Sequence, residues 1–157
     1  MRFLGAGLWS LFLLLAIALE RREAARTLAE LGGLCRLTAH MKEQLSVAPT
    51  PLPRIYATFE NEALSRVGFL TCLRKSGLAA ALTAHTLSLS EETLRPFLEY
   101  AKGLGTRPYR EEYEAAKRAH ETAVRMLSDA EETYPRKRRL TGTLFFTGGM
   151  LLLLLLI

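Results

Sequence analysis

Two long runs without a charged residue constrain this chain more than any other feature of its sequence. The first covers residues 3–19 and the second covers residues 140–157, which are 17 and 18 residues long. As an α-helix each run would be about 26 Å long, close to the hydrocarbon core of a bilayer at about 30 Å. We therefore expect two transmembrane helices, residues 1–19 and 140–157, on either side of a polar domain, residues 20–139.

The stretch between the runs has the composition of a folded domain in contact with water. It carries 20 of the 21 Lys and Arg residues and all 16 Asp and Glu residues. The chain is 49% apolar, which is too much for a disordered protein, and its two cysteines are too few for a disulfide-stabilised small domain. The net charge of +5 arises mainly from basic residues beside the two runs.

These basic residues predict the orientation in the membrane. Only Arg2 precedes the first run. The basic residues that border the runs on the domain side are Arg21, Arg22, Arg136, Lys137, Arg138 and Arg139. The positive-inside rule places such residues, and therefore the domain, in the cytoplasm. We expect the basic cluster at 136–139 to contact anionic lipid headgroups and not nucleic acid.

The first run has a second interpretation, as a cleaved signal peptide. Residues 16–18, Ala-Ile-Ala, fit the small-x-small rule for cleavage. This tripeptide lies inside the apolar run, and Arg21 and Arg22 follow at once, an order that favours an uncleaved anchor. The alternative is an exported helical domain held by its C-terminal span, acting as an adaptor or adhesin.

The periodicity of the polar domain predicts an all-α fold. Apolar and small residues recur every three or four positions over residues 24–45 and 109–134, which predicts two long helices paired antiparallel as stalks. Shorter helices are expected between them as a bundle. Gly77 is expected to separate two of these, and Ser88 with Glu91 to form a capping box for the next, which Gly103 ends.

A proline-rich turn must end the first long helix. It consists of Pro49, Thr50, Pro51, Leu52 and Pro53. No helix interior accepts three prolines in five residues, and Thr50 is expected to cap the helix that follows. If both stalks begin at the membrane, this turn lies far from it. We predict that the turn faces a partner.

The last long helix carries a heptad seam of alternating three- and four-residue steps. The seam residues are Tyr109, Tyr113, Ala116, His120, Ala123, Leu127, Ala130 and Tyr134. The favoured interpretation is packing against the helix at 24–45, and the alternative is self-association into a homo-oligomer. His120 is expected to be a packed residue and not a ligand.

Sequence motifs for catalysis, metal binding or phosphate binding are weak in this chain. None of the three histidines belongs to an HExxH pattern, and the two cysteines are 37 positions apart. Residues 103–106, Gly-Leu-Gly-Thr, lack the lysine of a phosphate-binding loop. We predict that the chain is not an enzyme and takes neither cofactor nor metal.

Four segments in order resemble the stage III sporulation protein AB family of endospore-forming bacteria. They are residues 25–31 (Ala-Arg-x-Leu-x-x-Leu), 50–53 (Thr-Pro-Leu-Pro), 97–105, and the closing run that begins at Gly148-Gly149. The chain departs from the family at Arg107 and Pro108, where relatives usually have Ser-Asp, and at Glu112, where they usually have Gln. If those polar groups contact a partner in relatives, the departures put that contact in doubt for this chain.

The resemblance implies a function. Family members are subunits of the channel complex between mother cell and forespore, in the mother-cell membrane around the forespore. Their soluble domain is similar to the cytoplasmic domain of platform proteins in type II secretion and type IV pilus systems. By that likeness the domain would couple a cytoplasmic secretion-type ATPase to the membrane apparatus without catalysis of its own.

Overall fold

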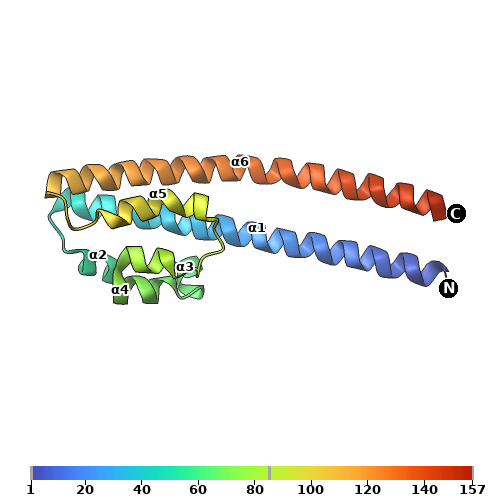
Figure 1. The fold of residues 1–157 in the computed structure, drawn as a ribbon, viewed down its shortest axis with the longest axis horizontal. Coiled ribbons are helices and arrows are strands. Elements are labelled where there is room, and N and C mark those ends of the chain that lie inside the picture. The colour runs from blue at the N-terminus through green and yellow to red at the C-terminus, as the bar shows by residue number, and fades with distance from the viewer. Residues whose placement is uncertain (1, 85, 157) are drawn as a thin grey trace. The chain divides into compact units, whose positions relative to one another are not determined.

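The computed structural model describes residues 2–84 and 86–156, and the side chains of residues 15, 16, 18–84 and 86–133. The described residues form helices joined by short connections and contain no strand, which confirms the all-α prediction. The helices are α1 (Arg2–Val47), α2 (Leu52–Thr58), α3 (Glu62–Arg66), α4 (Phe69–Thr83), α5 (Glu91–Lys102) and α6 (Tyr109–Leu156) (Figure 1).

The chain divides into two compact units. One contains Met1–Ala25 and Asp129–Ile157, and the other, which we call the helical domain, contains Arg26–Ser128. Most side chains of the predicted spans, together with Tyr134 and the basic cluster at 136–139, lie outside the described residues. Within the part of the chain that is described, no helix combines the length and the apolar character needed to cross a bilayer.

The proline-rich turn ends α1 as predicted. α1 ends at Val47, and α2 begins at Leu52 with Pro51 as the residue before its first turn. The expectation that Thr50 caps α2 is wrong, because no side chain caps this helix and the Thr50 hydroxyl donates instead to the Ala48 carbonyl at 3.3 Å. Proline already fixes the backbone angle that a helix start requires, so α2 begins without a side-chain cap.

Gly77 interrupts α4, as the sequence predicts. Its φ of 85° and ψ of 176° are not helical, so Phe69–Thr83 consists of two helical pieces on either side of the glycine. Only a residue without a Cβ adopts this backbone conformation without strain. The break leaves Leu73 before it and Leu78 after it both buried in the core.

The start of α5 differs from the prediction by two residues. Ser90 and not Ser88 caps the helix, since its hydroxyl accepts the Thr93 amide at 3.3 Å. The Ser88 amide donates instead to the carboxylate of Glu30, which is 1% exposed and also accepts the Arg26 guanidinium at 2.8 Å. A tertiary contact with α1 therefore holds the backbone at Ser88, two residues before the cap.

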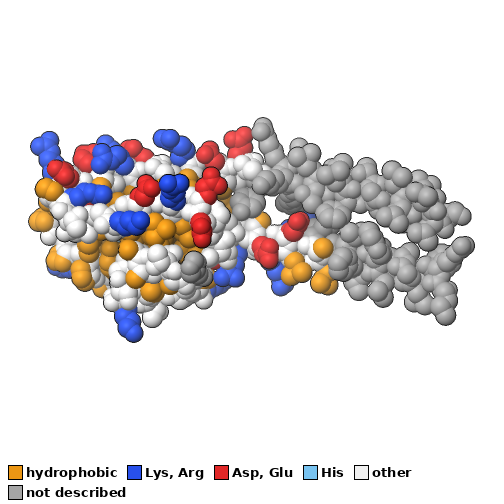
Figure 2. All heavy atoms as spheres, in the orientation of Figure 1, with side chains coloured by type: hydrophobic (Ala, Val, Ile, Leu, Met, Phe, Trp, Pro, Cys, Tyr) orange, Lys and Arg blue, Asp and Glu red, His pale blue; other side chains and the backbone are white. Residues whose placement is uncertain are grey.

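In the helical domain α1 and α6 pack side by side and antiparallel. The Tyr109 hydroxyl donates to the Leu45 carbonyl, and Thr38 Oγ1 lies 3.4 Å from His120 Nδ1. As the residue number rises along α6 it falls along α1, which defines the antiparallel direction. On the opposite, outer side of α6, charges of both signs alternate (Figure 2).

The core of the domain is formed where the short helices meet α1. α4 packs against α2, α3 and α5. The largest apolar side chains that are fully or almost fully buried are Leu34, Leu37, Met41, Ile55, Leu64, Phe69 and Leu73. Gly33 lets α3 approach α1, because a Cβ at this position would lie 2.7 Å from Leu64 Cγ. The neighbouring Gly32 has open space around it, so only Gly33 is required by packing.

Candidate functional site

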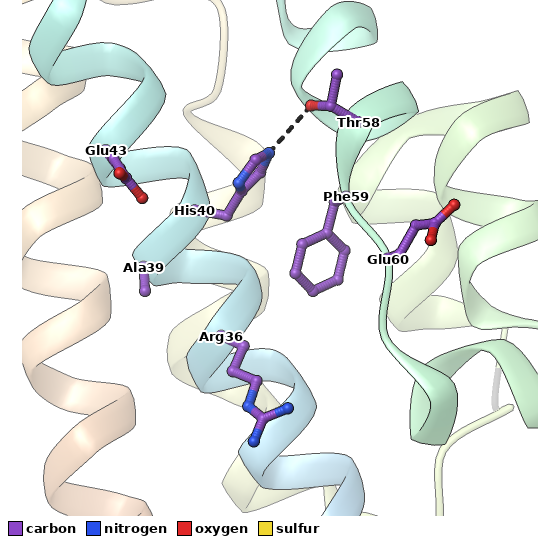
Figure 3. Close-up of a pocket in the computed structure, with 7 residues that line it drawn as sticks. All are labelled: Arg36, Ala39, His40, Glu43, Thr58, Phe59 and Glu60. Carbon is purple, nitrogen blue, oxygen red and sulfur yellow. Dashed lines mark hydrogen bonds between the residues drawn. The ribbon is translucent and has the colours of Figure 1, made fainter.

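A surface hollow of about 440 Å³ lies between α1 and the extended connection that joins α2 to α3. It is lined by Arg36, Ala39, His40, Glu43, Thr58, Phe59 and Glu60 (Figure 3). The four residues of α1 are three or four positions apart and therefore share one face of that helix. The remaining three are consecutive and form the opposite wall. We refer to these seven residues as the hollow.

His40 and Phe59 point toward one another across the hollow (Figure 3). His40 Nε2 lies 3.1 Å from Thr58 Oγ1, and the two ring centroids are 5.6 Å apart with the planes inclined by 42°. Phe59 is only 5% exposed, so its ring belongs to the core and closes the hollow from below. The hydrogen bond to Thr58 and the ring contact with Phe59 together join the two walls of the hollow through His40.

Arg74 of α4 holds the wall opposite α1 in place. Its Nη2 donates to the Phe59 carbonyl at 2.9 Å and its Nε to the Tyr56 carbonyl at 3.4 Å. A guanidinium with two hydrogen bonds to one short segment restricts the backbone of that segment. The wall that carries Phe59 is therefore anchored to α4 from behind.

The rim of the hollow is charged and exposed. Arg36 and Glu43 are exposed on α1, and Glu60 is exposed on the other side. Figure 3 shows the Glu60 carboxylate directed away from Phe59 and the Arg36 side chain running beside the lower part of the hollow. The lining is therefore mixed, with the polar pair His40 and Thr58 beside the apolar ring of Phe59 and charged side chains at the edge.

The predicted seam faces α1 within the helical domain. Ala116 and Ala123 are fully buried, and His120 is half-buried beside Thr38. Tyr113, Leu127 and Ala130 are half-buried, whereas Tyr109 is 42% exposed although its hydroxyl reaches α1. Small side chains at 116 and 123 permit the close approach of the two helices. At Tyr109 and His120 the seam contacts α1 of the same chain, and the interpretation of the whole seam stays a prediction.

The predicted partner-facing turn lies at the end of α1 and does not line the hollow. Its three prolines are exposed, and Thr50 and Leu52 are half-buried. The Leu52 side chain lies near Gly105, since a Cβ at that glycine would be 3.6 Å from Leu52 Cδ1. The turn therefore packs beside the α5–α6 connection. Of the basic residues predicted at the membrane interface, Arg21 and Arg22 are exposed.

A second group of polar side chains is buried in the domain, near the start of α6. We call it the buried polar cluster, and it consists of Tyr56, Tyr100, Arg107 and Glu112. Both carboxylate oxygens of Glu112, the Tyr100 hydroxyl and Arg107 Nη1 are buried without a hydrogen-bond partner within the protein. Glu112 and Tyr100 are each 6% exposed, so these two side chains are largely shielded from the surface.

Burial dominates the electrostatics of this cluster. It raises the pKa of Tyr56 to about 12, an effect that a hydrogen bond to the Leu78 backbone opposes and the charge of Glu112 reinforces. Burial also raises the pKa of Tyr100 above its usual range, with Glu112 and Tyr56 adding to the shift and Arg107 opposing it. Both tyrosines therefore stay neutral well above pH 10.

Two of these features went unrecognised in the sequence although each leaves a signal there. Glu112 lies four positions before Ala116 and thus on the buried face of α6. Arg36 has glycine, alanine or histidine, and never a carboxylate, at the positions three and four away. The extended wall that completes the hollow leaves no such signal, because its position depends on Arg74 in a different helix.

Comparison with known proteins adds no relative: no protein-family model, curated protein or solved structure matches the chain. Among the described residues no group of three or more His, Cys, Asp or Glu side chains is arranged to hold a metal ion. Cys35 is buried, and burial raises the pKa of its thiol, while the charge of Arg36 lowers it to a smaller extent. We therefore take the hollow as the candidate contact site of the helical domain.

Proposed function

We propose that this chain is a non-catalytic, membrane-anchored assembly subunit whose helical domain binds a cytoplasmic secretion-type ATPase. The observation that carries the proposal is the hollow, with its buried aromatic floor and exposed rim of both charge signs. In this proposal the ATPase hydrolyses ATP, and the domain transmits the resulting movement to the membrane apparatus. The sequence segments that resemble the stage III sporulation AB family support the same assignment.

The proposal includes two membrane spans, residues 1–19 and 140–157, with the domain in the cytoplasm of the mother cell. The two uncharged runs and the basic residues beside them support this topology. Because α1 and α6 each contain one of the runs, a force on the helical domain would reach both spans through continuous helices. The complex would be the channel between mother cell and forespore.

Cysteine labelling tests the topology. Lys75 is exposed on α4, so Lys75→Cys in a Cys72→Ser background provides one accessible thiol, with the native Cys35 buried. A membrane-impermeant maleimide should label this thiol only after the cells are permeabilised. Labelling of intact cells would contradict the proposal and support the exported adaptor instead.

Binding tests the function. The full chain in lipid nanodiscs should bind the purified cognate ATPase, and charge reversal at Arg36 should weaken the complex. The matched control is Arg118→Glu, since Arg118 is also an exposed arginine on a long helix but lies outside the hollow. Absence of any complex with the wild-type chain would refute the proposed coupling.

A further inference from the structure

The carboxylate of Glu112 is buried at the start of α6 without a hydrogen bond. Its side chain is 6% exposed, and neither oxygen has a partner among the described residues. The Tyr100 hydroxyl and Arg107 Nη1 are likewise buried without a partner there. Polar groups that leave water without gaining a hydrogen bond raise the free energy of the folded state. An opening that returns these three side chains to water therefore recovers that free energy.

The connection between α5 and α6 is held largely by hydrogen bonds to itself and to the end of α5. The Thr106 amide and hydroxyl both donate to the Gly103 carbonyl, at 3.5 and 3.0 Å, and the Gly103 amide donates to the Tyr100 carbonyl at 3.2 Å. Gly105, Thr106 and Pro108 are exposed. Local hydrogen bonds at an exposed surface are typical of segments that open while the rest of a fold stays intact.

The first turn of α6 is attached to the domain weakly and the next turn firmly. The Tyr109 hydroxyl donates to the Leu45 carbonyl at the end of α1, yet the Tyr109 side chain is 42% exposed (Figure 1). Glu112 is buried and the three residues before it are exposed, so the first turn is buried through a side chain whose own burial is unfavourable. Ala115 and Ala116 are both buried, and they mark the point from which α6 is packed.

We propose that the connection and the first turn of α6 open together while the rest of the helical domain stays folded. In the closed state Glu112, Tyr100 and Arg107 are shielded, and in the open state water solvates them. Opening also breaks the contact between Tyr109 and α1, so it loosens the pairing of the two long helices at this end of the domain. The inference does not rest on the proposed function, because it involves neither the hollow nor a partner.

Hydrogen exchange tests the opening, followed by mass spectrometry on overlapping peptides of the full chain in detergent micelles. The Glu112 amide donates to the Pro108 carbonyl at 2.9 Å, and the amides up to residue 115 donate in the same way to carbonyls of the first turn. The amides of residues 119–123 lie in the same helix beyond this turn. Those of residues 112–115 should exchange at least about tenfold faster. Equal protection of the two groups would overturn the inference.

Glu112→Gln tests whether the buried charge favours the opening. The amide keeps the shape of the side chain and removes the charge, so the closed state gains over the open state. Exchange of residues 113–115, corrected for intrinsic rates, should become at least about fivefold slower. An unchanged or faster exchange would contradict the role of the buried carboxylate.

Glu111→Gln is the matched control, because Glu111 is an exposed glutamate in the same turn. A negative charge near the N-terminus of a helix stabilises that turn, so its removal should leave the exchange of residues 113–115 unchanged or make it faster. The two variants therefore have opposite expected signs. If both slow the exchange alike, net charge and not burial is responsible, and the inference fails.

Low concentrations of urea separate a local opening from unfolding of the whole domain. An opening that exposes little surface has a small dependence on urea, whereas global unfolding has a large one. Exchange of residues 112–115 should therefore change little with urea, less than that of the core part of α1, residues 31–41. A parallel acceleration of both segments would show that the first turn opens only when the domain unfolds, which refutes the proposal.

Discussion

The hollow and the buried polar cluster contain similar residues in opposite surroundings. Each combines arginine, glutamate and aromatic side chains within residues 26–128. In the hollow the charges of Arg36, Glu43 and Glu60 are exposed, whereas both oxygens of Glu112 are buried without a hydrogen bond. Water solvates the first group at no cost, but a buried polar group without a partner destabilises the fold.

From this difference we expect the hollow to control binding and the buried polar cluster to control stability. Substitutions of the exposed charges should alter binding and leave stability unchanged. Substitutions in the cluster should alter stability and leave the contact surface unchanged. Hydrogen exchange of the full chain in detergent micelles, followed for peptides from residues 26–128, measures stability for every variant below.

The largest effect on stability is expected at Phe59, which belongs to the hollow but is buried like the residues of the cluster. This residue lines the hollow but is 5% exposed, so its ring is part of the core. Phe59→Ala should lower the free energy of unfolding by about 3–5 kcal/mol through lost burial and a residual cavity. Phe59→Leu, the control, should cost clearly less. Unchanged exchange in the alanine variant would mean that the ring does not support the domain.

Glu112→Gln should have the next largest effect and should be stabilising. The amide keeps the shape of the side chain and removes the charge of a carboxylate that lacks hydrogen bonds. We expect the free energy of unfolding to rise by about 1–3 kcal/mol. Glu114→Gln, on the exposed face of the same helix, should change it by less than about 0.5 kcal/mol. A loss of stability in the Glu112 variant would show that the charge is compensated.

High pH should lower the stability of the fold, because it ionises the tyrosines of the buried polar cluster. The pKa of Tyr56 is about 12 in the folded chain, above the value of about 10 for an unfolded tyrosine. Between these values the folded state holds a proton that the unfolded state has lost, so stability is full below pH 10 and falls as pH rises toward 12. Each such tyrosine contributes a slope of about 1.4 kcal/mol per pH unit.

Variants with phenylalanine test the source of this slope. Tyr56→Phe and Tyr100→Phe remove the ionisable groups, so the decline above pH 10 should become shallower in each, and shallowest in the double variant. An identical decline in all of them would assign the pH dependence to groups outside the cluster.

The smallest effect on stability is expected at the rim of the hollow. Arg36→Glu and Glu43→Arg should each change the free energy of unfolding by less than about 0.5 kcal/mol, because exposed charges without ion pairs contribute little. A loss above about 1 kcal/mol in either variant would remove the distinction between the two groups.

Local sequence signals predicted most of the fold. The prolines at 49–53 and the unusual backbone of Gly77 are local effects, so the C-terminal end of α1 and the break in α4 follow from the residues themselves. The alternation along α6 likewise identified Ala116 and Ala123 as buried. These features need no knowledge of distant parts of the chain.

The sequence predictions fail where local structure depends on a residue far away in the chain. Ser88 and Ser90 are both acceptable caps by sequence, and in the structure Ser90 caps α5 while the Ser88 amide donates to the distant carboxylate of Glu30. The wall of the hollow depends on Arg74 of α4 in the same way. The partner-facing role of the turn at 49–53 stays a prediction, because it rests on the distance of the turn along the helix alone.

The bond between Glu30 and Ser88 also has a consequence for the order of events during synthesis. The two residues are 58 positions apart, so Glu30 leaves the ribosome well before Ser88 is added. Closing a loop of that length carries an entropic cost that local helix formation does not. α1 can therefore form early, with Glu30 paired only to Arg26. The connection before α5 is fixed only after Ser88 has been added, so earlier intermediates should be recognised by a solvent-accessible Glu30.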